Sequence, residues 1–353
     1  MSEKRIVRLG LWIDEAFGEW LAREPGARLW VCPADSPEAD LLAALAEAHV
    51  YHCGSAKDEN PRHACVTDAM LARCPSLLCV STYGAGYDTV DVAACTRAGV
   101  IVVNQAGGNA RSVAEHTIAL ALAVSRRIVE SDRRLRRERG FSREDLMGRE
   151  LAGKTIGLVG IGHTGTATAR LAAAFGMTVV AVDPFLSEEE IGRRGARALP
   201  LDALLATSDV VSLHCPRDRT TLNLLDAAAI SRMKRGAIFV STARGGIHDE
   251  IALAEALRFG HLAGAGLDVW HEEPPPLDHP LLALDTVVAT VHTAGVTHEA
   301  RRNIAVLGAE QIATVLRGGH PPRLVNPEAW PAYAKRFEAA FGFAPAPRGA
   351  AID

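Results

Sequence analysis

The chain contains, between residues 155 and 165, the stretch Thr155-Ile156-Gly157-Leu158-Val159-Gly160-Ile161-Gly162-His163-Thr164-Gly165, and this stretch decides its fold. It is a G-x-G-x-x-G pattern between an apolar run and an alanine-rich helical pattern, and this context makes it specific. Gly160 allows a tight turn, Gly162 lets a pyrophosphate approach backbone N–H groups, and Gly165 allows the helix to pack on the strand. The stretch therefore predicts the phosphate-binding turn of a dinucleotide fold.

An aspartate at the end of the next predicted strand indicates which dinucleotide binds. Asp183 follows Val179-Val180-Ala181-Val182, 23 positions beyond the first glycine, Gly160, where its carboxylate can accept hydrogen bonds from a ribose 2′-OH. A 2′-phosphate would meet like charge there, and Glu188, Glu189 and Glu190 follow in place of the arginines that NADP requires. NAD is the predicted cofactor. A glycine-rich turn beside an unrelated surface aspartate is the alternative, and it is less consistent with strand, helix and spacing together.

Short β-branched runs alternate with helical patterns on both sides of this stretch, which predicts an α/β protein with two doubly wound parallel sheets. Six strands are predicted in the second half, a complete dinucleotide fold, at residues 155–159, 178–182, 209–213, 237–241, 263–267 and 286–290. Five strands are predicted in the first half, at residues 6–11, 28–31, 50–53, 77–81 and 100–103. Helices are expected at residues 66–72 and 298–317. One long helix, at residues 112–137, is expected to begin with a capping box formed by Ser112 and Glu115.

Bulk composition narrows the class of protein. The 38 Lys and Arg residues nearly balance 42 Asp and Glu residues, so no overall field favours nucleic acid or a membrane surface. The seven cysteines form no C-x-x-C pair, which disfavours a metal site and fits a reducing compartment. The N-terminus lacks the apolar core of a signal peptide, and no apolar run reaches the roughly 20 residues of a membrane span. A soluble cytoplasmic protein without a metal is predicted.

Three polar residues follow successive late strands, at the sheet edge where open α/β sheets bind ligands: Arg244, Glu273 and His292. Reduction of a keto carbon leaves negative charge on the oxygen, so His292 is the candidate proton donor. Glu273 would hold the imidazole in place and favour its protonated form, while Arg244 would bind a substrate carboxylate through its planar fork. Each residue alone has an ordinary structural explanation, but the three together, behind a nucleotide loop, indicate a catalytic site.

These motifs resemble the D-2-hydroxyacid dehydrogenase family over roughly residues 50–330. The resemblance rests on the 160–165 glycine loop, Ala243-Arg244-Gly245, the run from Ala263 to Val269 with Glu273-Pro274, His292, and Ser112-Val113-Ala114-Glu115-His116. It implies D stereochemistry, a homodimer, and a dinucleotide (Rossmann) NAD-binding domain inserted in a flavodoxin-like substrate domain. The implied domains are residues 1–108 with 299–345 for substrate and residues 109–298 for NAD.

The resemblance also implies roles for individual residues. Arg244, Glu273 and His292 match the catalytic residues of the family, and Asp268 matches the residue near the nicotinamide amide. Residues expected to bind the cofactor are Gly160, Gly162, His163, Thr164, Gly165, Asp183, His214, Cys215, Pro216, Thr242, Ala243, Asp268, His292 and Ala294. Residues expected to bind the substrate are Tyr83, Gly84, Ala85, Gly86, Arg244 and His292, with the backbone N–H groups of the 83–86 loop holding the carboxylate.

Three departures from the family pattern affect the substrate more than the reaction. Val291 stands where proline commonly precedes the catalytic histidine, and Ser241 replaces a frequent asparagine. Residues 57–63 look like an insertion, from which Lys57 or Arg62, or else the nearby His52, would contact a second anionic group of the substrate; a solvated loop is the simpler interpretation. Glyoxylate, hydroxypyruvate, 2-ketobutyrate and bulkier acids all remain open.

Alternative functions are possible within the same resemblance. A formate-dehydrogenase-like enzyme would need no acid–base pair and would carry glutamine where Glu273 stands. An NAD-sensing corepressor would keep the three catalytic residues but turn over little small keto acid. The arginines between residues 133 and 139 suggest nucleic-acid binding only weakly, because acidic residues alternate with them; a solvated face or dimer rim fits better.

Overall fold

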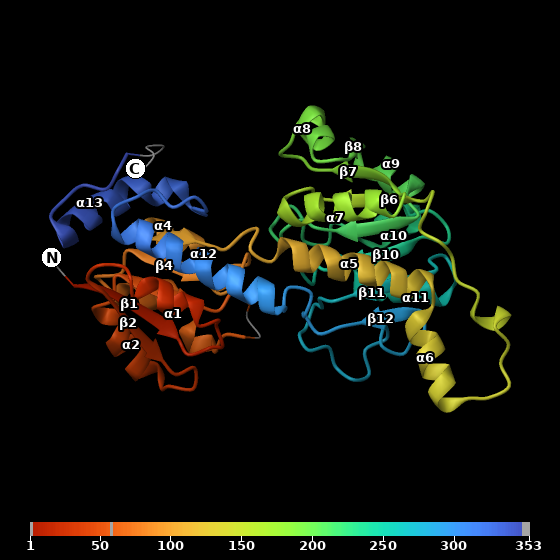
Figure 1. Cartoon of the computed structure of the whole chain (residues 1–353), viewed down its shortest axis with the longest axis horizontal. Helices are drawn as coiled ribbons and strands as arrows, with labels where there is room; N and C mark the ends of the chain where they lie inside the picture. The colour runs from red at the N-terminus through yellow and green to blue at the C-terminus, as the bar shows by residue number, and fades with distance from the viewer. Residues whose placement is uncertain (1–2, 57–58, 348–353) are drawn as a thin grey trace. The chain divides into compact units, whose positions relative to one another are not determined.

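The computed structural model describes residues 3–56 and 59–347, and the chain divides into two compact units (Figure 1). Unit 1 consists of Met1–Asn109 and Thr297–Asp353, and unit 2 is the intervening Ala110–Val296. Each unit has its own parallel sheet with helices on both faces. The chain is therefore an α/β protein in which one doubly wound unit is inserted into another.

In the described part of unit 1 the sheet has five parallel strands in the order β2-β1-β3-β4-β5, which is the flavodoxin-like order. Their bounds are β1 Lys4–Leu9, β2 Ala27–Cys32, β3 Val50–Cys53, β4 Cys79–Thr82 and β5 Ile101–Val103. Every residue of β3, β4 and β5 is buried, because helices cover both faces of the central strands. The helical segments are α1 Ala16–Leu21, α2 Glu38–Ala46, η1 Arg62–Ala64, α3 Asp68–Ala72, α4 Val92–Arg97, α12 His298–Leu316, η3 Pro327–Ala329 and α13 Trp330–Phe341.

In unit 2 the described residues form seven parallel strands in the order β12-β11-β10-β9-β6-β7-β8. The bounds are β6 Thr155–Val159, β7 Thr178–Val182, β8 Arg197–Ala198, β9 Val210–Leu213, β10 Ile238–Ser241, β11 Gly264–Leu267 and β12 Val287–Ala289. The strand order reverses between β6 and β9, and a dinucleotide fold binds its ligand at this switch point. The helical segments are α5 Ala110–Ser125, α6 Ile128–Arg137, η2 Glu144–Leu146, α7 His163–Ala174, α8 Glu188–Arg193, α9 Leu201–Thr207, α10 Ala227–Arg232 and α11 Glu250–Arg258.

Two apolar cores hold the sheet of unit 2. Ile156 and Leu158 of β6 face one core, which includes Ile118 and Leu120 of α5. Val159 of the same strand belongs to the other core, on the side of α9, α10 and α11. Alternate residues of a strand point to opposite faces, so β6 is buried on both sides and its carboxyl end is held in a fixed place.

The prediction of one helix over residues 112–137 is wrong. α5 ends at Ser125 and α6 begins at Ile128, because Arg127 between them adopts a left-handed backbone with φ of 53°. The Arg127 side chain holds this break through bonds to Glu130 and to the Asp145 carbonyl. The capping box is also wrong, since Ser112 lies inside α5, which already begins at Ala110.

The short strand β8 and the C-terminal helix α13 were not predicted from the sequence. β8 has only two residues, Arg197–Ala198, too few for an alternating pattern to be recognised. α13, Trp330–Phe341, buries Trp330, Tyr333 and Phe337 against the sheet of unit 1. None of the helices in residues 3–56 and 59–347 combines the length and apolar character that crossing a bilayer requires.

Candidate active site

The glycine loop lies at the switch point of the unit 2 sheet, directly after β6. Gly160 has φ of 92°, and a Cβ there would stand 2.8 Å from the Cys215 nitrogen, so only glycine fits the turn. Gly162 is exposed, and a Cβ at this position would meet nothing within 4 Å, which leaves space for a ligand beside the loop. α7 begins at His163 with no side-chain cap at Gly162, so its first N–H groups are available to an anion.

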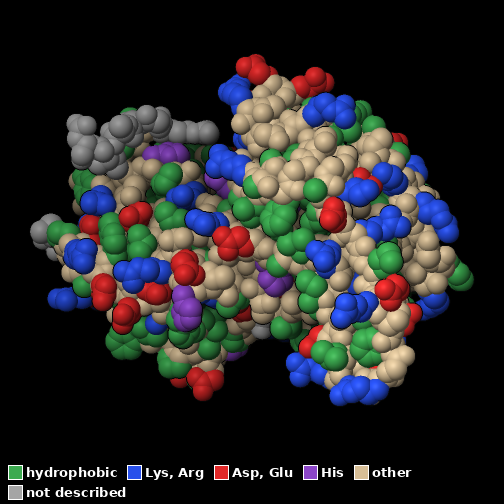
Figure 2. Space-filling view, turned by 45° about the vertical axis from the view of Figure 1, so that its right-hand side comes forward, with side chains coloured by type: hydrophobic (Ala, Val, Ile, Leu, Met, Phe, Trp, Pro, Cys, Tyr) green, Lys and Arg blue, Asp and Glu red, His purple; other side chains and the backbone are tan. Residues whose placement is uncertain are grey.

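Asp183 lies at the end of β7 and is bonded to the glycine loop. Its Oδ2 accepts a hydrogen bond from the Ile161 N–H (3.0 Å), and its Oδ1 accepts one from the Phe185 N–H (3.1 Å). Arg194 donates to the carbonyl of the same residue, Ile161 (2.8 Å). Acidic side chains gather over α8, at the top of the view in Figure 2. A helix start for the pyrophosphate and a carboxylate for the ribose hydroxyls fit NAD.

The segment after β9 packs against the glycine loop. The His214 N–H donates to the Val159 carbonyl (2.8 Å), and its Nε2 pairs with the Ser212 hydroxyl (3.0 Å). Burial lowers the pKa of His214 to about 4, so the ring is neutral at pH 7. Burial also raises the pKa of the Cys215 thiol to about 11, so this cysteine is not a reactive thiolate. Pro216 follows and is exposed.

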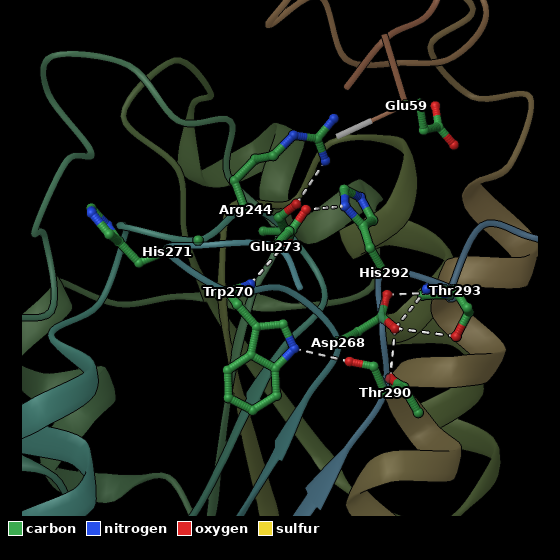
Figure 3. A network of polar contacts seen from close by, with 12 residues as sticks. Glu59, Arg244, Asp268, Trp270, His271, Glu273, Thr290, His292 and Thr293 are labelled. Atoms are coloured by element: carbon green, nitrogen blue, oxygen red, sulfur yellow. Dashed lines mark hydrogen bonds and ion pairs between the residues drawn. The ribbon is translucent and has the colours of Figure 1, made fainter. Parts of the chain in front are cut away.

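The three predicted catalytic residues lie together at the carboxyl edge of the same sheet (Figure 3). Nδ1 of His292 is 2.8 Å from Oε2 of Glu273, and Oε1 of Glu273 accepts the Trp270 N–H at 2.9 Å. Arg244 follows β10, and its Nη1 donates to the Ala243 carbonyl (2.8 Å). Both carboxylate oxygens of Glu273 are thus used to orient it toward the imidazole.

Electrostatics favour a protonated imidazole. Burial opposes the charge on His292, but the hydrogen bond and the negative charge of Glu273 outweigh it and hold the pKa of His292 above its ordinary value. Burial likewise opposes ionisation of Glu273, yet His292, the Trp270 N–H and the charge of Arg244 lower its pKa. The pair is therefore a carboxylate and an imidazole with raised proton affinity, which suits a general acid near neutral pH.

His292 adopts an unusual backbone that a buried aspartate stabilises. Its φ is 52°, a left-handed conformation that is rare for residues other than glycine, and its N–H donates to the Asp268 carbonyl (2.6 Å). Asp268 is fully buried, and its carboxylate accepts the N–H groups of Thr293 (2.8 Å) and Ala294 (2.9 Å) and the Thr290 hydroxyl (2.6 Å). The turn is thus built without the proline that commonly precedes the catalytic histidine.

The Arg244 segment contacts the loop that carries Glu273. A Cβ at Gly245 would overlap the Trp270 carbonyl oxygen, so a larger residue would displace one backbone from the other. Upstream, the hydroxyl of Thr242 pairs with that of Thr117 from α5 at 2.9 Å. The close approach at Gly245 therefore sets the spacing between Arg244 and the Glu273 loop.

The predicted substrate loop, residues 83–86, lies in unit 1 after β4. Three of its carbonyl oxygens accept hydrogen bonds from within unit 1. The Gly84 carbonyl accepts the Gln105 N–H (2.8 Å), the Ala85 carbonyl the Asn104 side-chain amide (2.8 Å) and the Gly86 carbonyl the Thr82 hydroxyl (2.8 Å). The N–H of a trans peptide points opposite to its carbonyl, so the N–H groups of residues 85–87 face the other way, as an anion-binding loop requires, whereas the Tyr83 N–H is bonded to the Cys53 carbonyl (2.9 Å). Tyr83 is buried, and its hydroxyl donates to the Leu9 carbonyl.

His52 does not contact a substrate anion, so this part of the second-anion hypothesis is wrong. The ring is fully buried and stacks on Phe17 (4.5 Å between centroids). Burial lowers the pKa of His52 to about 3, so it carries no positive charge at neutral pH. Arg62 is exposed on η1, while Lys57 lies outside the described residues. Ser241 is fully buried in β10, and nothing in the structure explains its replacement of asparagine.

Three residues near the site were not assigned roles from the sequence: Trp270, Thr290 and His116. Trp270 donates to both Glu273 and the Thr290 carbonyl, and His116 Nε2 lies 3.1 Å from the Thr290 hydroxyl. Trp270 and Thr290 lie within three positions of Glu273 and His292, and this closeness in sequence is the signal that could have identified them. Within the part of the chain that the structure describes, no group of three His, Cys, Asp or Glu side chains is placed to hold a metal ion.

Comparisons with known proteins agree with this site. The model of the "D-isomer specific 2-hydroxyacid dehydrogenase, NAD binding domain" family matches residues 118–294. The chain belongs to this family. It therefore carries the NAD-binding domain of the family in unit 2, and NAD is its cofactor.

Three relatives illustrate the range of the family. The D-3-phosphoglycerate dehydrogenase of Archaeoglobus fulgidus is 44% identical over 243 residues, which cover 69% of this chain and 46% of that one. A glyoxylate reductase of Korarchaeum cryptofilum is 40% identical over 257 residues, 72% of this chain and 77% of the other. The solved glyoxylate reductase from Paecilomyes thermophila superposes with a TM-score of 0.80 at 26% identity, covering 93% and 99% of the two chains. The chain spans about half the length of the phosphoglycerate dehydrogenases that it matches.

Proposed function

We propose that this protein is an NAD-dependent oxidoreductase that interconverts a small 2-keto acid and its D-2-hydroxy acid. The observation that carries the proposal is the bond of 2.8 Å between His292 and Glu273 at the sheet edge that also bears Arg244 and the NAD-binding loop. Relatives named D-3-phosphoglycerate dehydrogenase and glyoxylate reductase act on substrates of this class. Neither a formate-dehydrogenase-like enzyme nor a corepressor-like protein is favoured, because Glu273 provides an acid–base pair and the matched relatives are enzymes.

The three catalytic residues divide the work. NADH, when bound, supplies the hydride that reduces the keto carbon. His292 donates a proton from Nε2 to the carbonyl oxygen as negative charge develops on it. Glu273 holds the ring by Nδ1, which leaves Nε2 as the donor, and its charge keeps the imidazole protonated until transfer. Arg244 binds the substrate carboxylate and polarises the carbonyl. In oxidation His292 accepts the proton.

Residues of both units are proposed to bind the ligands. In unit 2 NAD would be bound by the glycine loop together with His163, Thr164, Asp183, the His214–Pro216 segment, Thr242, Ala243, Asp268 and Ala294. In unit 1 the N–H groups of the 83–86 loop other than that of Tyr83, which is bonded to the Cys53 carbonyl, would hold the substrate carboxylate, supported by the bonded carbonyls of this loop. Residues 1–108 and 299–345 then form a substrate domain, and residues 109–298 the NAD domain.

Exposed apolar residues on unit 2 support a homodimer. Ile128 and Leu135 of α6 and the nearby Met147 are 54%, 61% and 71% exposed, and α6 buries none of its residues. Arg134 and Arg136 of α6, which pair with Glu138 and Asp132, would lie at the rim of such an interface. Seven free cysteines support a reducing, cytoplasmic location. The near balance of 38 basic and 42 acidic residues supports a protein with neither nucleic acid nor a membrane as partner.

The test follows NADH absorbance at neutral pH with a panel of 2-keto acids, for the wild type, His292→Ala and Arg244→Ala. Rapid NADH oxidation with one acid, lost in both variants and weak with NADPH, is the expected result. Exposed His271→Ala is the matched control and should keep full activity. Absence of turnover with every acid despite tight NADH binding would overturn the proposal in favour of an NAD-sensing role.

A further inference from the structure

A second carboxylate–imidazole pair lies in unit 2, outside the proposed catalytic residues. Glu250 is the first residue of α11, and its Oε1 accepts the His271 N–H (2.8 Å). Its Oε2 pairs with Nε2 of His279 at 3.1 Å. Both side chains are 11% exposed. Glu250 therefore bonds two points of the loop between β11 and β12, one on each side of Glu273.

The hydrogen bonds of His279 define its tautomer. The Leu281 N–H donates to Nδ1 of His279 (3.3 Å), so this nitrogen accepts and Nε2 bears the hydrogen that faces Glu250. Both ring nitrogens are occupied within the loop and α11. The ring has no nitrogen left for a substrate, which gives the pair a structural task rather than a chemical one.

The ring of His279 packs against the residue that orients Glu273. Its centroid is 5.4 Å from that of Trp270, with the rings edge to face at 77°. Trp270 is 3% exposed, and its backbone N–H donates to Glu273 while its indole Nε1 donates to the Thr290 carbonyl (2.9 Å). Figure 3 shows the first bond at the backbone nitrogen of Trp270 and the second at its indole nitrogen. A continuous set of contacts thus leads from Glu250 to the Glu273 carboxylate.

We propose that Glu250 and His279 are positioning residues that place Glu273 against His292 through Trp270. The inference rests on the proposed function, since it assigns residues to the same proton transfer. Neither residue touches the substrate. The charged groups that face His292 are Glu273, Arg244 and Asp268, so displacement of Glu273 is what would weaken the protonated form.

Glu250→Gln is the sharpest test, because it keeps the shape and leaves one oxygen for two donors. The amide nitrogen must then face either the His271 N–H or the Nε2–H of His279, so one contact is lost. The expected result is a decrease in kcat of about tenfold with unchanged affinity for NADH. The alkaline limb of the kcat profile for keto-acid reduction should move to lower pH. Glu272→Gln, an exposed neighbour in the same loop, is the matched control and should change neither.

A double-mutant cycle separates positioning from general damage. If Glu250 acts through Glu273, adding Glu250→Gln to Glu273→Gln moves the alkaline limb no further. Additive shifts, or a limb unmoved by Glu250→Gln alone, would overturn the inference. NMR titration of the His292 ring in the wild type and Glu250→Gln gives the same comparison without turnover, with His292→Gln identifying the resonance. It therefore tests the pair even if no keto acid is a substrate.

Discussion

Two histidine–glutamate pairs lie in unit 2, and they have similar lengths but different surroundings. Nδ1 of His292 lies 2.8 Å from Oε2 of Glu273, and Nε2 of His279 lies 3.1 Å from Oε2 of Glu250. The side chains of the first pair are 23% and 17% exposed, whereas both members of the second are 11% exposed. His279 uses both ring nitrogens, but among the described residues Nε2 of His292 has no hydrogen bond.

The difference shows what turns an imidazole–carboxylate pair into an acid–base group. A carboxylate raises the proton affinity of a histidine, but this helps proton transfer only if the other ring nitrogen can reach a substrate. Glu273 meets this condition, because it orients Nδ1 and leaves Nε2 of His292 open. Glu250 instead bonds a backbone N–H and a ring that is already occupied. We therefore propose proton exchange for the first pair and positioning of a loop for the second.

The largest expected effect separates the two histidines directly. His292→Asn should lower kcat by about 10²–10⁴-fold, because the general acid is lost. His279→Asn should lower it far less, since only the position of Trp270 is disturbed. Single-turnover rates with saturating NADH measure both. Equal losses of kcat in the two variants would contradict different roles for His292 and His279.

Arg244→Lys tests how much the reaction proposed for His292 and Glu273 depends on carboxylate binding by Arg244. Lysine keeps the charge but loses the planar fork, so two parallel hydrogen bonds become one. We expect the KM for the keto acid to rise roughly 10–100-fold, the equivalent of a charge-assisted bond of about 1.5–3 kcal/mol. Initial rates over a range of keto-acid concentrations give the value. An unchanged KM would show that Arg244 does not bind the carboxylate.

Glu273→Gln should change the pH dependence of the reaction. In the proposed mechanism reduction needs protonated His292, whose pKa is raised, so kcat/KM should be full at low pH and fall as pH rises through that pKa. Glutamine removes the charge that opposes the effect of burial, so the fall should begin at lower pH. The same substitution leaves NADH binding intact, which fluorescence titration checks. A profile that does not move would contradict the assignment of Glu273.

The smallest expected effect concerns stability. Glu250→Gln leaves a poorly matched donor in a part of unit 2 that is mostly buried, which costs about 1–3 kcal/mol. This lowers Tm by about 2–4 °C for each kcal/mol in a unit of this size. Exposed Glu255→Gln on the same helix should leave Tm within about 1 °C. Differential scanning calorimetry compares the two variants, and an equal Tm for both would argue that the hydrogen bonds of Glu250 do not stabilise the loop.

Much of the fold follows from local patterns. Four-residue buried strands such as β3 and β9 are recognisable because their apolar runs stand between turns. The break at Arg127 is not, since its left-handed backbone is stabilised by Asp145, a residue distant in sequence whose contact no helical pattern encodes. α13 was missed for a similar reason: it is stabilised by packing of its aromatic face on the unit 1 sheet.

The sequence alone determined the residue types that chemistry requires and the order in which they follow strands: the glycine loop, Asp183, Arg244, Glu273 and His292. Parallel strands bring their carboxyl ends to one edge, so this order is enough to predict that these residues gather. Only the tertiary structure decided how each is oriented. Asp268 supports the left-handed turn at His292, and His52 is buried and uncharged rather than exposed to substrate. Orientation and burial depend on contacts between distant segments, and those contacts form only when the chain is folded.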